Sequence, residues 1–73
     1  MTKIYLSNKD IFATIKEANH IVDALEGLDT SSKAYGDLMD ALNATLDVFL
    51  CCYRKDFQLR LSKRTGHYYV TFS

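Results

Sequence analysis

The residues of this chain best suited to covalent or acid–base chemistry are two cysteines and two histidines. Cys51 and Cys52 are adjacent in the sequence, whereas His20 and His67 are distant from them and from each other. A cysteine nucleophile needs a neighbouring base, and a zinc site needs ligands at separated, characteristic spacings. Neither arrangement is indicated, because the helical pattern described below places Cys52 on an apolar stripe and His20 on a polar face. The sequence therefore predicts a protein that is not an enzyme and has no catalytic residue, metal site or cofactor.

A second group of residues is suited to binding. In the fold expected below, several polar and aromatic side chains lie on the uncovered face of a small sheet. Tyrosine and arginine are enriched at the energetic centres of protein interfaces, and rings among cations also bind single-stranded nucleic acid. The same side chains also suit a solvated sheet face, on which an arginine and a tyrosine stabilise each other across the strands. The candidate partner-binding residues are Lys3, Tyr5, Arg60, His67 and Tyr69, with Gln58 and Thr71 on the same face.

Charges are distributed unevenly along a chain whose net charge is zero. Residues 1–50 hold four lysines and eight acidic residues, a net charge of −4, and residues 51–73 hold five basic residues and one aspartate, a net charge of +4. The two halves can attract each other within one fold, or the basic segment can bind an anionic partner. Three aspartates of the second expected helix form either a solvated face or an acidic ridge that docks on a basic groove. These residues are Asp37, Asp40 and Asp47.

Length and composition predict one small domain, residues 1–73. Hydrophobic residues make up 48% of the chain and charged residues 25%, which is typical of soluble globular proteins. The longest apolar run, residues 48–53, is too short to span a bilayer, and the N-terminal residues lack the apolar stretch of a signal peptide. Adjacent cysteines rarely form a disulfide with each other, so we expect a reducing, cytoplasmic setting and no membrane association.

Hydrophobic periodicity predicts a strand and then a helix in the first part of the chain. Residues 3–6 alternate polar and apolar side chains, which is typical of a strand. Ser7 begins a helix in which its hydroxyl accepts a backbone N–H, and Asp10 lies in the first turn. Gly27 is expected to end that helix in the left-handed conformation. The apolar stripe of the helix comprises Ile11, Ile15, Ala18, Val22 and Leu25, widened by Phe12, Ile21 and Leu28.

The second predicted helix has two interpretations at its end. Residues 29–32 supply caps for its start. Residues 48–53 are apolar on all sides and rich in strand formers, so they either continue the helix or form an extra strand; the lack of an intervening glycine or proline favours the helix. Such a helix must be covered by the sheet or by a second copy of the chain. The candidate self-association residues are Val48, Phe49, Leu50, Cys51 and Tyr53.

The C-terminal residues predict a β-hairpin whose register follows from parity. Apolar and polar side chains alternate over residues 57–62 and again over residues 67–72. Both apolar sets fall on one face only if the loop has an even number of residues, because a shift by one residue turns every side chain to the other face. A four-residue loop, 63–66, that closes through a left-handed Gly66 meets this condition. The expected cross-strand pairs are Leu61–Tyr68, Arg60–Tyr69, Leu59–Val70 and Phe57–Phe72.

Together these elements predict an α+β fold, a two-layer sandwich with the order β-α-α-β-β. An antiparallel helix hairpin would pack on one face of a small antiparallel three-stranded sheet, in which the first strand pairs with the second. This element order is similar to that of the RelE/ParE family of bacterial toxins, which are small ribonucleases or gyrase poisons. The similarity covers element order without a shared motif, and it implies an RNA-cleaving toxin as a third functional hypothesis.

The favoured hypothesis is a small non-enzymatic binding protein. It would act as an inhibitor or adaptor by occupying a surface of a larger macromolecule, with a protein as its partner. Chains of this size and composition are frequent among phage and mobile-element accessory proteins. The alternative is a nucleic-acid-binding module that uses Tyr5, Arg60 and Tyr69, and a homodimer through residues 48–53 is compatible with both hypotheses.

Overall fold

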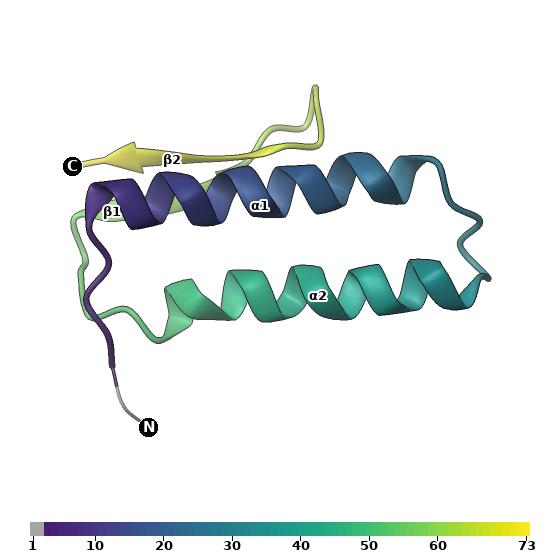
Figure 1. The fold of residues 1–73 in the computed structure, drawn as a ribbon. Coiled ribbons are helices and arrows are strands. Elements are labelled where there is room, and N and C mark those ends of the chain that lie inside the picture. Colours follow the sequence, from purple (N-terminus) through teal and green to yellow (C-terminus); the bar gives the residue numbers. More distant parts are fainter. Residues whose placement is uncertain (1–2) are drawn as a thin grey trace.

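The computed structural model describes residues 3–73 and contains two helices followed by a β-hairpin (Figure 1). Helix α1 spans Asn8–Glu26 and helix α2 spans Lys33–Leu50. The hairpin consists of strands β1 (Phe57–Leu61) and β2 (Tyr68–Phe72). Helix α1 lies between α2 and the hairpin, so that it packs along α2 on one side and along β2 on the other.

Helix α1 begins as predicted and buries part of its predicted apolar stripe, with Val22 and Leu25 half-buried and Phe12 exposed. The hydroxyl of Ser7 accepts the Asp10 N–H at 3.1 Å, and the Asp10 carboxylate accepts the Ser7 N–H at 3.2 Å. This capping box satisfies two backbone donors that have no partner within the helix. The side chains of α1 that become buried are Ile11, Ile15, Ala18 and Ile21.

Gly27 follows the last residue of α1, but the predicted left-handed conformation was wrong. Its φ is −91°, and the next N–H, that of Leu28, donates to the Leu25 carbonyl at 3.1 Å. The chain therefore leaves the helix through a further right-handed turn, which any residue could adopt.

Helix α2 starts at the predicted caps, but it ends earlier than the favoured interpretation of residues 48–53 predicted. The Ser32 hydroxyl accepts the Tyr35 N–H at 3.1 Å, and the helix ends at Leu50 with Cys51 as its C-cap. The prediction of a continuous helix through residues 48–53 is right up to Leu50 and wrong beyond it. Backbone groups after the helix instead pair with Ile4, whose N–H donates to the Cys51 carbonyl at 2.8 Å.

The prediction of a three-stranded sheet was wrong, because residues 3–6 do not form its first strand. Within residues 3–73 the sheet has two strands, and Ile4 forms an isolated parallel bridge with Cys52. The Ile4 carbonyl accepts the Tyr53 N–H at 3.2 Å, so the segment that leaves α2 takes the backbone groups that would have paired with β1. The fold remains α+β. Its order is α-α-β-β, so the element order that suggested RelE/ParE toxins is not present in the described residues.

The predicted packing of both helices on one sheet face was also wrong, and the width of the hairpin explains why. Two strands about 4.8 Å apart form a ribbon about as wide as one helix. The hairpin therefore packs along α1 alone. Helix α2 contacts the hairpin near its own C-terminal end, where the ring centroid of Phe49 lies 5.7 Å from that of Phe57.

The register of the hairpin is confirmed at each predicted pair. Arg60 is opposite Tyr69 and Leu59 is opposite Val70, in an antiparallel ladder that runs from Phe57–Phe72 to Leu61–Tyr68. Residues 63–66 form the loop, and Gly66 has a φ of +76°. Its N–H donates to the Ser62 carbonyl at 2.9 Å and closes the turn.

Two glycines offer a matched pair of alanine substitutions with opposite expected effects. Gly66→Ala should destabilise the protein by about 1 kcal/mol, because a side chain strains a left-handed residue. Gly36 lies inside α2, and a methyl group there would meet nothing within 4 Å. Gly36→Ala should therefore stabilise the protein by up to about 1 kcal/mol through helix propensity. Urea unfolding of both variants measures the change in the free energy of unfolding. A change of the same sign in both variants would contradict the assigned conformations of the two glycines.

The buried core consists of two small clusters. Leu6, Ile11 and Ile15 form the first, beneath the hairpin, and the second, between the helices, comprises Ala18, Ile21 and Leu42. Tyr68 of β2 packs against both and joins them. Over residues 3–73, neither helix combines the length and the apolar character that crossing a membrane requires.

Candidate binding surfaces

The structure separates the predicted partner-binding residues. Arg60 and Tyr69 face each other across the hairpin, as predicted. Lys3 and Tyr5 were expected on the same sheet face, and this placement was wrong, because residues 3–6 do not join the sheet. The ring centroid of Tyr5 instead lies 5.8 Å from that of Tyr53. The four residues therefore do not form one platform.

The outer face of the hairpin carries a small polar network around Arg60. Its guanidinium donates to the Gln58 side-chain oxygen at 2.7 Å and to the Thr71 hydroxyl at 3.3 Å. Tyr69, opposite Arg60, keeps 45% of its surface exposed. The register of the predicted Arg60–Tyr69 pair is present, but the guanidinium contacts are with Gln58 and Thr71, and they hold the arginine close to the sheet surface.

His67 was also expected on the open sheet face, and this placement was wrong. Its Nε2 lies 2.6 Å from Asp23 Oδ1 on α1, because the chain bends toward the helix where the hairpin loop ends. An aspartate in contact with an imidazole can orient a general base. Cys51 and Cys52 follow the end of α2, far from Asp23 near the end of the antiparallel α1, so they cannot act as its nucleophile. No group of three or more metal-binding side chains occurs among residues 3–73.

Most of the large exposed hydrophobic side chains gather at one end of the molecule. This end lies at the left of Figure 1. It is formed by the N-terminal segment, the start of α1, the end of α2, the start of β1 and the end of β2. Of the eight large hydrophobic residues exposed in the described chain, only Leu61 and Tyr69 lie elsewhere. We call this surface the aromatic end; its six exposed residues are Ile4, Tyr5, Phe12, Leu50, Tyr53 and Phe72.

Ring contacts connect the exposed side chains of the aromatic end to the interior. The ring centroids of Phe12 and Phe72 lie 5.8 Å apart, and Phe72 is 6.5 Å from Phe57. Phe57 in turn contacts the half-buried Phe49 of α2. Such tilted and edge-on pairs are each worth about 0.5–1.5 kcal/mol beyond area burial. The exposed rings are thus held in defined positions by rings behind them.

Arg54 organises the other half of the aromatic end. It forms a two-pronged ion pair with Asp56, at 2.9 and 2.7 Å, and its third nitrogen donates to the Leu6 carbonyl at 2.7 Å. The guanidinium carbon lies 5.5 Å from the ring centroid of Tyr5 and 5.8 Å from that of Phe57. These hydrogen bonds lower the pKa of Asp56 below its ordinary value and raise that of Arg54. The arginine therefore fixes residues 5 and 6 against the segment that leaves α2.

In the sequence, Arg54 counts only toward the charge of residues 51–73, and no such role was predicted for it. The signal that points to it is an arginine between Tyr53 and Phe57, because guanidinium groups stack on aromatic faces.

The predicted self-association segment is divided between the core and the surface. Val48 and Phe49 are half-buried against the first core cluster, and Cys51 is half-buried next to them. Leu50 is 77% exposed and Tyr53 is 52% exposed. Only the last two therefore offer a large apolar surface to another molecule.

The predicted acidic ridge is present as a row of exposed side chains on α2. Asp37, Asp40 and Asp47 are all exposed. Spacings of three and seven residues place them on one side of the helix. None of them forms an ion pair with another described residue. Either a solvated helix face or a docking ridge fits this arrangement.

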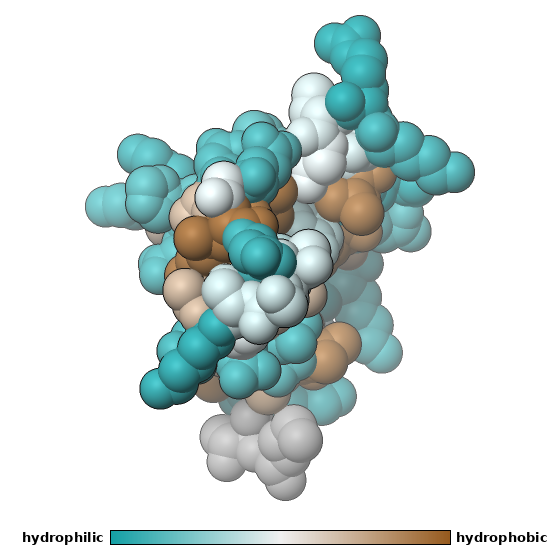
Figure 2. Space-filling model, turned by 90° about the vertical axis from the view of Figure 1, so that its right-hand side faces the viewer, coloured by the Kyte–Doolittle hydropathy of each residue, from teal (hydrophilic) through white to brown (hydrophobic). Residues whose placement is uncertain are grey.

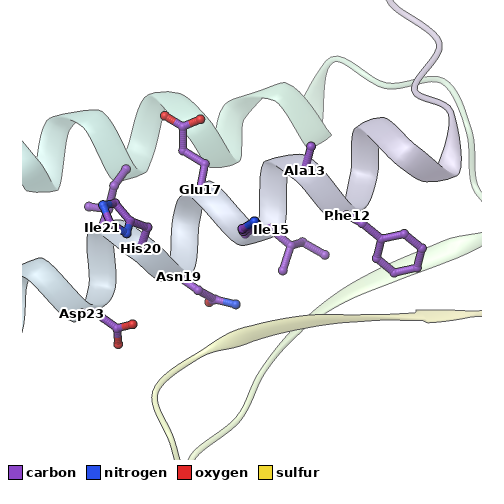
Figure 3. Close-up of a pocket in the computed structure, with 9 residues that line it drawn as sticks. Phe12, Ala13, Ile15, Glu17, Asn19, His20, Ile21 and Asp23 are labelled. Atoms are coloured by element: carbon purple, nitrogen blue, oxygen red, sulfur yellow. The ribbon is translucent and has the colours of Figure 1, made fainter.

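A shallow depression follows the exposed side of α1 and is lined by residues of that helix alone (Figure 3). Phe12, Asn19 and Asp23 point toward β2, whereas Ala13 and Glu17 point away from it. Asn19 bonds to β2 and Asp23 lies against His67, so its polar groups mostly serve the fold. The depression lacks the convergent set of polar groups expected of a small-molecule site.

The end of the molecule opposite the aromatic end has a different character. Figure 2 views this end, where residues 27–32 join the helices, and hydrophilic side chains interrupt its apolar areas. The hairpin loop projects above the rest of the surface in the same view. Its exposed cations, Lys63 and Arg64, lie away from the aromatic end.

No family model, curated protein or solved structure that was compared with the chain matches it. Its function is therefore inferred from its own residues and geometry.

Proposed function

We propose that the protein is a small non-enzymatic binding protein, an inhibitor or adaptor that occupies a surface of a larger protein through its aromatic end. The observation that carries this proposal is the concentration of six of eight large exposed hydrophobic side chains at that end. A concentration of exposed apolar side chains of this kind is typical of protein interaction sites. Two tyrosines beside an arginine are the residue types that dominate binding energy in such sites.

The arrangement at the aromatic end favours a protein partner over nucleic acid. The guanidinium of Arg54 is engaged by Asp56 and by the Leu6 carbonyl, so few of its donors remain to contact phosphate. Tyr5 packs beside Tyr53, away from Arg60, so the base-stacking platform expected from the sequence is incomplete. Rings already held in place lose little conformational freedom on binding, which favours a rigid protein contact.

The test compares two tyrosine substitutions in a pull-down experiment. Tagged wild-type protein, Tyr53→Ala and Tyr69→Ala are incubated with bacterial lysate, with and without nuclease, and captured proteins are identified by mass spectrometry. Tyr53 and Tyr69 are similarly exposed, at 52% and 45%, but only Tyr53 belongs to the aromatic end. We expect one stoichiometric protein that survives nuclease and is at least about tenfold depleted with Tyr53→Ala, because a central interface tyrosine contributes about 2 kcal/mol or more.

The other outcomes contradict the proposal in distinct ways. Loss of all captured material after nuclease treatment would favour the nucleic-acid alternative. A captured protein lost with Tyr69→Ala and retained with Tyr53→Ala would move the site to the hairpin face. Circular dichroism of both variants verifies that they remain folded.

A further inference from the structure

The outer edge of strand β1 has no backbone partner in the described chain. The Ser62 N–H donates to the His67 carbonyl, and the Ser73 N–H donates to the Asp56 carbonyl. These two bonds show that the even-numbered residues of β1 direct their backbone groups toward β2. In an antiparallel pair, residues between such hydrogen-bonded positions direct their N–H and C=O groups outward. On β1 these residues are Phe57, Leu59 and Leu61, and no described residue bonds to their backbone. Neither helix packs along this strand.

The outer edge of β2 is protected in part, since α1 packs along β2 and bonds to Tyr68, whereas no helix packs along β1. The Asn19 side chain accepts the Tyr68 N–H at 2.6 Å and donates to the Tyr68 carbonyl at 3.0 Å. One amide of α1 thus replaces the pairing that a third strand would supply at this position. Proteins usually cover or block an exposed strand edge, because it offers unpaired backbone groups to another chain. Strand β1 has no proline, and its loop-side residue Leu61 exposes 53% of its surface.

Basic residues flank β1 at both ends of the strand. Asp56 is the one acidic residue between positions 54 and 64, and it is already bonded to Arg54. A second copy pairing edge to edge would bring two such basic segments together, and this repulsion disfavours a homodimer through β1. The same charge favours an acidic strand. The basic residues of this segment are Arg54, Lys55, Arg60, Lys63 and Arg64.

We propose that β1 accepts an extended acidic segment of a protein partner as a third strand. Strand addition supplies main-chain hydrogen bonds to Leu59 and Leu61, and alternate side chains provide selectivity. Residues of the added strand opposite Phe57, Leu59 and Leu61 would lie on the core side and should be apolar. Those beside Gln58 and Arg60 would lie on the outer face and should be acidic. This site borders the aromatic end at Phe57, whereas its backbone groups at Leu59 and Leu61 lie farther along β1.

The probe is a synthetic peptide, Glu-Val-Glu-Val-Glu-Val-Glu, blocked at both ends and titrated into 15N-labelled full-length protein. Amide hydrogen exchange is followed by NMR, because it reports individual backbone donors. We expect the Leu59 and Leu61 amides to exchange at least about tenfold more slowly with saturating peptide. The Gln58 and Arg60 amides, which already donate to β2, should change little. The same peptide with lysine in place of glutamate is the charge control and should not bind.

Two variants of Leu61 separate backbone pairing from side-chain contact. Leu61→Pro removes the outward N–H without removing a hydrogen bond to β2, so it should abolish binding. Leu61→Ala keeps the N–H and should bind within about threefold of wild type, because it loses only a half-exposed side chain. If Leu61→Pro loses protection at Gln58 and Arg60, the hairpin is disturbed. In that case the blocked variant is the peptide instead of the protein: the peptide is N-methylated at alternate residues, so that it cannot donate hydrogen bonds to β1.

Several results would overturn the proposal. These are a peptide that leaves the Leu59 and Leu61 amides unprotected, full binding by Leu61→Pro or by N-methylated peptide, and equal binding of the lysine peptide. Protection of the same amides without peptide, rising with protein concentration, would assign the edge to a second copy. The peptide experiment measures β1 amides and the pull-down measures Tyr53, so either proposal can fail while the other stands.

Discussion

Substitution of Ile11 by alanine is expected to destabilise the protein by about 2–4 kcal/mol. Ile11 has no exposed surface and packs with Leu6 and Ile15 in the cluster beneath the hairpin. Alanine would remove three carbons and leave a cavity where α1 meets the hairpin. A chain of this length has a total stability of roughly 4–11 kcal/mol, so this loss is a large share of it.

Chemical unfolding in urea, followed by circular dichroism, measures this effect as a shift in midpoint. Ile11→Val deletes one methyl group and should cost about 1 kcal/mol, in proportion to the smaller cavity. Leu50→Ala is the exposed control. Leu50 is 77% exposed, so its substitution should change stability by less than about 0.5 kcal/mol. If Ile11→Ala and Leu50→Ala gave similar midpoints, the assigned core would be incorrect.

Substitution of Asn19 by alanine is expected to cost about 2 kcal/mol, because it leaves two part-buried backbone groups of Tyr68 without partners. The Asn19 amide is the direct hydrogen-bonded link between α1 and β2, and it lies 49 residues from Tyr68 in sequence. The amide hydrogen of Tyr68 should also exchange with solvent faster in the variant. The substitution would also leave the outer backbone groups of β2 at Tyr68 without a partner.

Asn43 supplies the matched control for this experiment. It is an exposed asparagine within α2, and Asn43→Ala should be neutral or slightly stabilising because alanine is the better helix former. Asn19→Asp tests the direction of the two hydrogen bonds. The carboxylate can still accept the Tyr68 N–H but cannot donate to the Tyr68 carbonyl, so this variant should also be destabilised. Equal stability of Asn19→Ala and Asn43→Ala would contradict the role of Asn19.

The elements that could be predicted from sequence are those governed by neighbouring residues. The Ser7 hydroxyl accepts a backbone N–H as expected, and the helical apolar spacing places Ile11 and Ile15 in the core. The hairpin register followed from parity and from a glycine able to adopt positive φ at position 66. Each of these depends on local backbone geometry and on side-chain alternation, which a short stretch of sequence contains.

The tertiary structure alone decided with which backbone groups residues 3–6 pair. That pairing in turn decided where the candidate binding surfaces lie. Alternation identified an extended segment but could not choose between β1 and residues 51–53 as its partner. Residues 51–53 are the partner, because the backbone of Ile4 bonds to Cys51 and Tyr53. The Arg54 side chain also donates a hydrogen bond to the Leu6 carbonyl. That competition between distant backbone groups placed Tyr5 beside Tyr53 and left β1 with an open edge. Long-range pairing depends on every group within reach in space, and a pattern read along the chain does not contain those distances.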